Sequence, residues 1–262
     1  MNIVVTGSRG TIGKVLVKTL KKRKHTVIPL IHDEVDFRDQ KVILEFLNTH
    51  QPDAIMHLAK AEEDITATLA KWSYEHRKAY LYTSSYKVFN GKKVEGPFKI
   101  TDTPDGTDEL ALYKQRLEKV SFENNPNSYV ARLSWQITDD PSGYGVLMFL
   151  KAQMDKAKKV SVSENMYPSL MFVDETANAL IDLIEKYQPG LYHLNQNDWY
   201  SLYDIVDYLK HQKGHDWIVL DPPRSIRKNE MLDNQKIKLK PLSEYGIKYH
   251  KEPEIFKTKK KA

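Results

Sequence analysis

The sequence predicts an α/β protein with a doubly wound parallel sheet, and three observations lead to that fold class. Apolar runs of strand length alternate with longer segments of helical periodicity through the first half of the chain. The chain begins with a β-branched run, a glycine turn and a helix-like pattern, in that order. Its 262 residues are enough for one large α/β domain, alone or with a smaller lobe. Sheets of this class bind ligands at the carboxyl edge of their strands.

The glycine turn is the most informative local feature. Gly7-x-x-Gly10-x-x-Gly13 follows a strand and opens a helix, which is the context that a pyrophosphate site requires. Glycines let the backbone turn sharply and approach phosphates, and a helix N-terminus offers free N–H groups and partial positive charge. We therefore expect a dinucleotide here. The expected cofactor contacts in the turn are Gly7, Arg9, Gly10, Thr11, Ile12 and Gly13.

The first half of the chain supplies the expected sheet. Strands are expected where β-branched and aromatic residues form short runs, and helices where apolar residues recur every three or four positions. The expected strands are residues 2–6, 26–31, 54–58, 79–83 and 128–133. The expected helices are residues 11–23, 40–50, 65–76 and 109–124. This order predicts a Rossmann-type sheet.

The second half has a looser rhythm. Helices are expected at about residues 145–158, 174–187 and 202–213, and strands at residues 160–162, 170–173 and 191–194. We expect a single unit over residues 1–262, in which about residues 1–135 form the NAD(P)-binding core. About residues 136–262 are expected to form mainly a small C-terminal substrate-binding lobe, with some elements returning to the core.

Composition limits the classes of protein. Hydrophobic residues make up 40% and charged residues 29%, which is typical of soluble globular chains, and no apolar stretch reaches membrane-spanning length. The N-terminus enters a strand at once, so we expect no signal peptide and a cytoplasmic location. The absence of cysteine excludes disulfides, thiolate zinc sites and cysteine nucleophiles.

Neither the distribution of charge nor the spacing of the histidines predicts a further binding partner. The net charge of +5 comes from lysines spread along the chain and from a lysine-rich tail at residues 257–261. We interpret that tail as a solvated terminus, and we expect neither a nucleic acid nor a membrane as a partner. The nine histidines show no metal-binding spacing, so no metal is expected.

Several landmarks recur in an order that marks a family. They are Gly7-x-x-Gly10-x-x-Gly13, Asp36-Phe37-Arg38-Asp39, the segment from Gln51 to Ala59, the segment from Thr83 to Gly91, Arg132-Leu133-Ser134-Trp135, Tyr192-His193-Leu194 and Leu232-Asp233. With them the chain resembles the extended short-chain dehydrogenase/reductase family. Within that family it is most similar to the dTDP-4-dehydrorhamnose reductases and to their relative, the regulatory beta subunit of methionine adenosyltransferase.

The resemblance implies a reduction of a nucleotide-linked keto sugar by a nicotinamide hydride. In the family, a serine or threonine holds the substrate oxygen, a tyrosine donates the proton, and a lysine four residues later lowers the tyrosine pKa and binds the ribose. Ser85 and Lys114 match the first and last of these roles. The resemblance places further cofactor contacts at Asp36, Phe37, Leu58, Ala59 and Lys114, and substrate contacts at Ser85, Trp135, Arg224 and Arg227.

Two departures put hydride transfer in question. Leu110 stands four residues before Lys114, and leucine cannot donate a proton. Tyr113 is about 100° further round the helix from Lys114 and is expected to pack elsewhere, and Tyr86, beside Ser85, is a weak substitute for the acid. In addition, the segment between Ala59 and the strand at residues 79–83 is shorter than the family's, and that segment normally borders the nicotinamide half of the cofactor.

The choice between NAD and NADP depends on the end of the second strand. An acidic residue there would bind the ribose hydroxyl of NAD, and His32-Asp33-Glu34 lies near that position. Arg9 and Arg38 could instead meet the phosphate of NADP. We expect NADP or NAD and favour NADPH.

The leading hypothesis is an NAD(P)-dependent nucleotide-sugar reductase-like protein with an impaired catalytic site. One alternative is a non-catalytic NAD(P)-binding regulatory subunit, and another is a sugar-nucleotide epimerase or dehydratase. The expected partner is a nucleotide sugar. A helix with Leu147, Leu150 and Met154 could form the face of a homodimer, or it could be core.

Overall fold

A computed structural model of the chain describes residues 1–31, 35–36, 38–90, 95–140, 145–222 and 227–250. Its central feature is a six-stranded parallel sheet in the order β10-β5-β4-β3-β1-β2. The six strands are β1 (Asn2–Thr6), β2 (Thr26–Leu30), β3 (Ala54–His57), β4 (Ala79–Ser85), β5 (Tyr129–Leu133) and β10 (Gly190–Leu194). The predicted fold class, a doubly wound parallel sheet, is confirmed.

The register of the sheet places its ligand-binding edge. Ile3 of β1 pairs with Val27 of β2 on one side and with Ala54 of β3 on the other. The strand order therefore reverses around β1, and a doubly wound sheet opens a crevice at the carboxyl ends of the strands where its order reverses. Thr6 and His57 end β1 and β3 at that edge.

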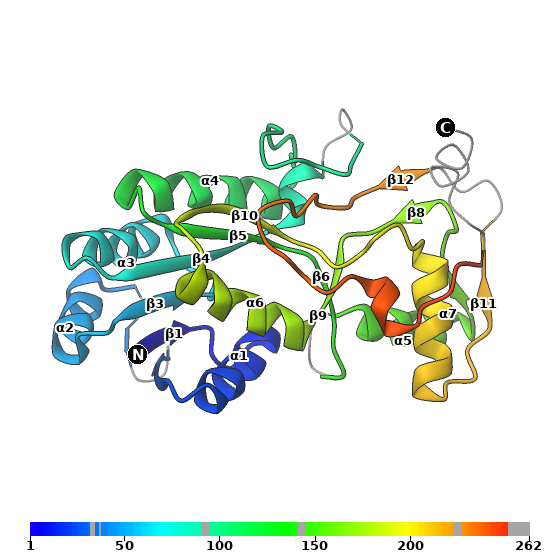
Figure 1. Cartoon of the computed structure of the whole chain (residues 1–262), viewed down its shortest axis with the longest axis horizontal. Helices are drawn as coiled ribbons and strands as arrows, with labels where there is room; N and C mark the ends of the chain where they lie inside the picture. Colours follow the sequence, from blue (N-terminus) through cyan, green and yellow to red (C-terminus); the bar gives the residue numbers. More distant parts are fainter. Residues whose placement is uncertain (32–34, 37, 91–94, 141–144, 223–226, 251–262) are drawn as a thin grey trace.

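Helices cover both faces of the sheet (Figure 1). They are α1 (Thr11–Lys22), α2 (Gln40–His50), α3 (Glu63–Glu75), α4 (Glu109–Asn124) and α6 (Val173–Lys186). Side chains alternate across a strand, so Ile3 and Val5 of β1 join the core with α1 and α6, whereas Val4 joins the core with α2, α3 and α4. Two elements from the second half of the chain thus belong to the sheet domain. Strand β10 extends the sheet by pairing with β5, and α6 packs on α1.

The remaining elements of the second half form a lobe beside the sheet (Figure 1, right). They are β6 (Trp135–Ile137), α5 (Val146–Ala157), β7 (Val160–Ser161), β8 (Met166–Tyr167), β9 (Leu170–Phe172), α7 (Leu202–Lys213), β11 (Val219–Leu220) and β12 (Lys228–Asn229), with a 3₁₀ turn η2 (Leu242–Tyr245). Leu150 is fully buried in the core of the lobe, and Leu147 and Met154 pack against it. These three residues of α5 therefore serve the core of the lobe.

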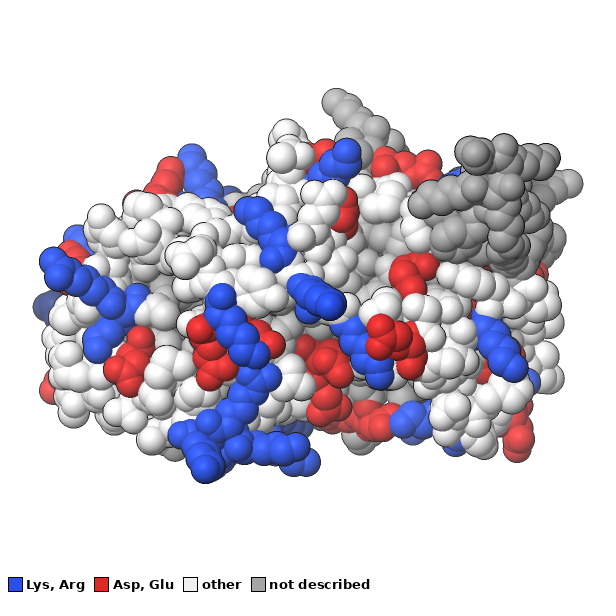
Figure 2. All heavy atoms as spheres, viewed as in Figure 1, with Lys and Arg blue, Asp and Glu red and all other residues white. Residues whose placement is uncertain are grey.

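The short elements are where expectation and structure differ most. Strand β4 runs two residues further than expected, to Ser85, and continues into a 3₁₀ turn η1 (Tyr86–Phe89). The strands β6, β8, β11 and β12 have two or three residues each, too few for a periodic pattern. No described helix is long and apolar enough to cross a membrane. Figure 2 shows Lys and Arg side chains gathered over α1, with acidic side chains close by.

Candidate functional site

The glycine turn has the geometry that the sequence predicts. Gly7 adopts a φ of +69°, a left-handed conformation that favours glycine, and its carbonyl oxygen accepts a hydrogen bond of 3.0 Å from the Gly10 amide. A Cβ atom on Gly13 would lie 2.0 Å from the Gly7 oxygen, and one on Gly7 would lie 2.8 Å from the Ala59 nitrogen. Side chains at Gly7 and Gly13 are therefore excluded, and the backbone forms an open cradle at the start of α1.

A pocket of about 210 Å³ lies over this cradle. It is lined by Gly7, Gly10, Thr11, Ile12, Gly13, Leu58, Thr83 and Gln136. The structure thus brings the predicted residue Leu58 to the glycine turn. The sequence missed Thr83 and Gln136, which lie within β4 and β6. Parallel pairing of β4 with β3 brings Thr83 to the pocket. The amides of the first turn of α1 have no acceptor within the helix, so they suit an anionic group.

A buried hydrogen-bond chain holds the floor of this pocket. The Thr6 hydroxyl accepts hydrogen bonds of 3.0 Å from the amides of Leu58 and Ala59, so its own proton goes to Nδ1 of His57 at 2.8 Å. Nε2 of His57 then donates to the Thr66 hydroxyl at 3.3 Å. This network assigns a neutral imidazole with its proton on Nε2.

Burial explains why His57 stays neutral. Burial, together with the smaller effect of the nearby charge of Lys114, lowers the pKa of His57 to about 3. His57 is therefore neutral at pH 7 and takes part as a hydrogen-bond bridge between β1, β3 and α3.

The adenine side of the expected site is only partly described. Asp36 is exposed and accepts a hydrogen bond of 3.0 Å from the Arg38 amide, while Asp39 caps the N-terminus of α2. Phe37 and His32-Asp33-Glu34 lie outside the described residues. Arg9, in the glycine turn, is exposed.

A second and larger cleft, of about 570 Å³, lies between the sheet and the lobe. It brings together Ser85, Tyr86 and Trp135 from the predicted site. It is lined by Ser85, Tyr86, Lys87, Leu110, Ser134, Trp135, Gln136, Phe149, Met166, Leu202, Lys228 and Glu230. Gln136 lines both this cleft and the glycine pocket, so the two spaces adjoin. Leu110 also lines this cleft and is 48% exposed.

Lys114 lies beneath this region and not in the cleft wall. Its ammonium donates a 2.8 Å hydrogen bond to the carbonyl oxygen of Thr83 and lies 4.9 Å from the Tyr82 ring centroid. Burial lowers the pKa of Lys114 to about 8, although the carboxylate of Glu118 opposes that shift. The contact with Thr83 places Lys114 directly behind a residue of the glycine pocket.

Tyr113 faces away from the cleft, as its position on the helix predicts. Its hydroxyl donates to the Ala61 carbonyl oxygen and accepts from the Ala61 amide, both at 2.9 Å. It thereby ties the short segment after Ala59 to α4. Burial, as the largest cause, raises the pKa of Tyr113.

Tyr86 is a poor acid in this structure. Burial raises the pKa of its hydroxyl, and the charge of Glu230 raises it further. Lys87 lies 4.9 Å from the Tyr86 ring centroid. Tyr86 keeps its proton at neutral pH and can act as a hydrogen-bond donor.

Several landmarks of the resemblance meet in one buried network under the cleft. Arg132 donates to both carboxylate oxygens of Glu118, at 2.9 and 2.7 Å, and Ser84 donates to the same carboxylate at 2.5 Å. Arg132 also lies 3.2 Å from Nε2 of His193, whose Nδ1 lies 3.2 Å from the Asp233 carbonyl oxygen. These landmarks hold α4, β4, β5 and β10 together and do not line the cleft.

Of the two arginines expected to contact the substrate, only Arg227 lies among the described residues. Arg227 is exposed, pairs with Glu95 at 3.4 Å and lies 6.0 Å from the Tyr167 ring centroid. It is not among the described residues that line the cleft, although its neighbour Lys228 is. Arg224 lies outside the described residues.

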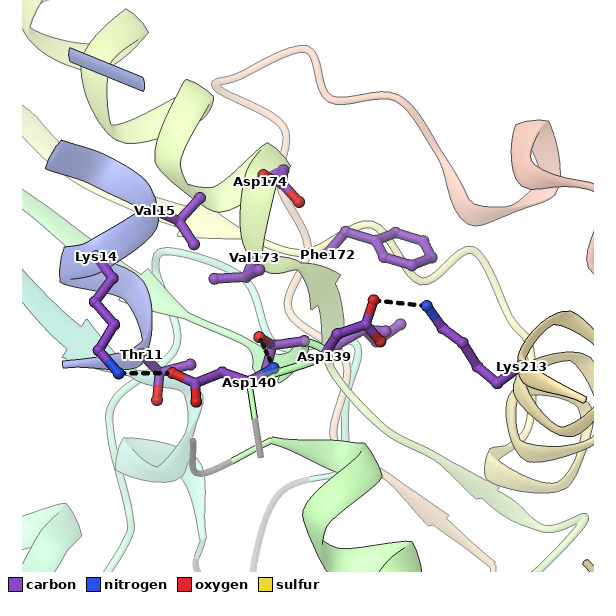
Figure 3. A pocket seen from close by; sticks show the side chains of 11 residues that line it. Thr11, Lys14, Val15, Asp139, Asp140, Phe172, Val173, Asp174 and Lys213 are labelled. Atoms are coloured by element: carbon purple, nitrogen blue, oxygen red, sulfur yellow. Dashed lines mark hydrogen bonds and ion pairs between the residues drawn. The ribbon is translucent and has the colours of Figure 1, made fainter. Parts of the chain in front are cut away.

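A third pocket, of about 380 Å³, adjoins the glycine turn at Thr11 (Figure 3). Lys14 of α1 pairs with Asp140 at 3.2 Å, and Lys213 of α7 pairs with Asp139 at 2.6 Å. Asp174 also lines it, so its described charged residues are three acids and two bases. This excess of acid makes it less suited to phosphate than the glycine pocket. No group of three His, Asp or Glu side chains suited to a metal occurs in the described ranges.

The chain is similar in sequence to known proteins over most of its length. A family model described as the RmlD substrate binding domain matches residues 1–231. SpsK, a spore coat polysaccharide biosynthesis protein of Bacillus subtilis, is 23% identical over 237 residues, which are 83% of this chain and 81% of that protein. The sequence similarity therefore spans most of both chains.

Two solved structures have the same fold. The dTDP-4-dehydrorhamnose reductase of Bacillus anthracis, in complex with NADP, aligns with a TM-score of 0.79 at 17% identity, over 93% of this chain and 96% of that one. The UDP-glucose 4-epimerase of Thermus thermophilus, in complex with NAD, aligns with a TM-score of 0.70 at 17% identity, over 97% and 95%.

Proposed function

Because the chain belongs to the family described by the RmlD substrate binding domain, we propose that it binds a nicotinamide dinucleotide and reduces a nucleotide-linked keto sugar. We favour NADPH over NADH, since the structure of the reductase from Bacillus anthracis is a complex with NADP. The dTDP-4-keto sugars are the first substrates to test. A cytoplasmic location and a homodimer remain predictions.

The observation that carries the proposal is the open backbone cradle at Gly7, Gly10 and Gly13. A Cβ on Gly13 would lie 2.0 Å from the Gly7 oxygen, so the turn can close only with glycine there. The pocket above it has no charged residue among its described lining, and it receives the N-terminus of α1. These features fit a pyrophosphate held by backbone amides.

The side chains then act on the substrate. When bound, a nicotinamide cofactor supplies the hydride. Ser85 donates a hydrogen bond to the carbonyl oxygen of the sugar, and Trp135, which lines the same cleft, contacts the sugar. Lys114 keeps Thr83, a residue that lines the glycine pocket, in place. Leu110 has no proton to give, and burial raises the pKa of Tyr86, so the cleft holds no efficient acid among these side chains. The proton comes from Tyr86 or from a water molecule, and turnover is slow.

A second function is favoured by the same cleft. With leucine at position 110, the chain can bind a dinucleotide and a nucleotide sugar without turnover and serve as a regulatory subunit. The epimerase or dehydratase alternative is less well supported, since both reactions also need proton transfer at the sugar.

The test uses the full chain. NADPH and NADH are titrated by fluorescence, and a dTDP-4-keto sugar is then added while the absorbance of the reduced cofactor is followed. Binding with slow oxidation is the expected result. Binding without oxidation would support the regulatory function, and failure to bind either cofactor would remove both proposals.

A further inference from the structure

The cleft beside Ser85 has a cationic end made by Lys87 and Lys228. Both ammonium groups approach the same carboxylate oxygen of Glu230, Lys228 at 2.5 Å and Lys87 at 4.0 Å. The Glu230 side chain is only 7% exposed, whereas the side chains of Lys87 and Lys228 are 32% and 53% exposed. The carboxylate is therefore a buried anchor, and the ammonium groups face the open space.

The charges in this cluster do not balance. One cation is enough to compensate a buried carboxylate, and Lys228 does so in direct contact. Lys87 is then a second cation in the same wall. The other oxygen of Glu230 is buried and has no hydrogen-bond partner among the described residues, so both lysines depend on one oxygen.

The rest of the wall gives an anion no competing charge. Among the described residues that line the cleft, the charged ones are Lys87, Lys228 and Glu230. The others are neutral and mostly apolar, as are Trp135 and Phe149. The lining therefore carries one positive charge more than negative, in a partly desolvated space where electrostatic attraction is stronger than in bulk water. Asp108, which also interacts with Lys87, is not part of that lining.

We propose that Lys87 and Lys228 bind the diphosphate that joins the nucleotide and the sugar of the substrate. This inference rests on the proposed function and identifies the residues that hold the substrate's charged centre. Lys87 is two residues from Ser85, so a diphosphate here leaves the sugar carbonyl within the same cleft. Arg227 pairs with Glu95 outside the cleft and takes no part.

The experiment measures ligand binding by calorimetry with the full chain. The probes are dTDP, thymidine and glucuronate, and the variants are Lys87→Ala and Lys228→Ala. Each variant is expected to bind dTDP about tenfold more weakly, as expected for loss of one charge-assisted contact. Thymidine binding stays unchanged, and the dTDP affinity becomes less sensitive to salt. Lys→Arg at either position restores binding to within about threefold, since guanidinium also binds phosphate.

A matched control is Lys119→Ala, which removes an exposed lysine of α4 that pairs with Glu123. It is expected to leave dTDP binding unchanged. The proposal is overturned if Lys87→Ala and Lys228→Ala bind dTDP like the parent, or if they weaken thymidine equally. Lysine-dependent binding of glucuronate but not of dTDP would also overturn it, by assigning the charge to a sugar carboxylate.

The same samples are titrated with NADPH, so the two proposals fail separately. If NADPH binds normally and the lysine substitutions do not change dTDP binding, only the assignment of the diphosphate site is wrong. If the parent chain neither binds NADPH nor oxidises it, the proposed function is wrong.

Discussion

The glycine pocket and the cleft beside Ser85 adjoin at Gln136, yet they keep very different shares of the family pattern. The glycine pocket depends on backbone geometry, and all three glycines are present. The cleft depends on side chains, and Leu110 lines it at the position where the resemblance to the reductases implies a proton-donating tyrosine. We infer from the comparison that cofactor binding depends on one region and proton transfer on the other, so that one can be altered while the other is kept.

The largest expected effect is at the glycine pocket. In Gly13→Ala the new Cβ would meet the Gly7 oxygen at 2.0 Å, and the turn must open. We expect NADPH affinity to fall by about a hundredfold or more, as for a strained backbone site. Gly10→Ala, whose Cβ would lie 3.3 Å from the same oxygen, should lose less. Fluorescence titration measures both, with circular dichroism as the check of folding. Equal binding by Gly13→Ala and the parent would contradict a backbone cradle.

The next effect is at the cleft and has the opposite direction. Leu110→Tyr places a phenol one helical turn before Lys114 and in the wall beside Ser85. We expect the rate of NADPH oxidation with a dTDP-4-keto sugar to rise by about a hundredfold, since a positioned acid contributes at least that much. The affinity for NADPH should not change.

A control separates this gain from a general effect of tyrosine. Leu112 lies on the same helix, is 42% exposed and is not among the described residues of the cleft. Leu112→Tyr should therefore leave the oxidation rate at the parent level. If both variants oxidise NADPH faster than the parent, or if neither does, position 110 is not the site that lacks a proton donor.

A third effect tests the floor of the glycine pocket through pH. The pKa of His57 falls from 6.5 to about 3 on folding, mainly because of burial. Between these values the unfolded chain binds the extra proton, so the free energy of unfolding falls as pH falls, by about 1.4 kcal/mol per pH unit. The stabilisation is complete above pH 6.5 and is lost towards pH 3.

His57→Asn removes this titration. We expect the variant to be about 1 kcal/mol less stable than the parent at pH 7, because a buried hydrogen bond is weakened. At pH 5 the difference should shift by about 2 kcal/mol in favour of the variant. Urea unfolding at the two pH values measures this difference. The pKa of His193 is also lowered, but His193 is present in both proteins and contributes equally to the pH dependence of their stability. A difference that does not change with pH would show that His57 is not buried and neutral.

The smallest expected effect concerns Arg227. Its side chain pairs with Glu95 at the surface, and exposed pairs contribute little. Arg227→Ala should change dTDP affinity by less than about twofold, a free energy below about 0.4 kcal/mol. A loss comparable to that of Lys228→Ala would return Arg227 to the substrate site.

The sequence predicted the sheet and the glycine turn because both follow from local rules. Apolar runs define β1 and β3, and a glycine spacing of three defines the turn. It did not predict Thr83 and Gln136 in the pocket, since their positions depend on the pairing of strands distant in sequence. The role of Lys228 was missed for a related reason, because β12 is only two residues long and meets the cleft through tertiary packing.

The resemblance found landmarks without telling their physical roles. Arg132 and His193 were recognised as landmarks, yet their contacts with Glu118 and Asp233 make them supports of the sheet. The resemblance does not distinguish side chains that line a cleft from side chains that brace it, and burial separates the two only in the structure.

The most direct test of the central claim compares NADPH binding and NADPH oxidation in the parent and in Leu110→Tyr. We predict equal dissociation constants for NADPH in both proteins and oxidation of NADPH by a dTDP-4-keto sugar that is much faster in the variant. A parent chain that binds no NADPH, or one that already turns over as fast as Leu110→Tyr, would contradict the separation of an intact cofactor site from an altered catalytic cleft.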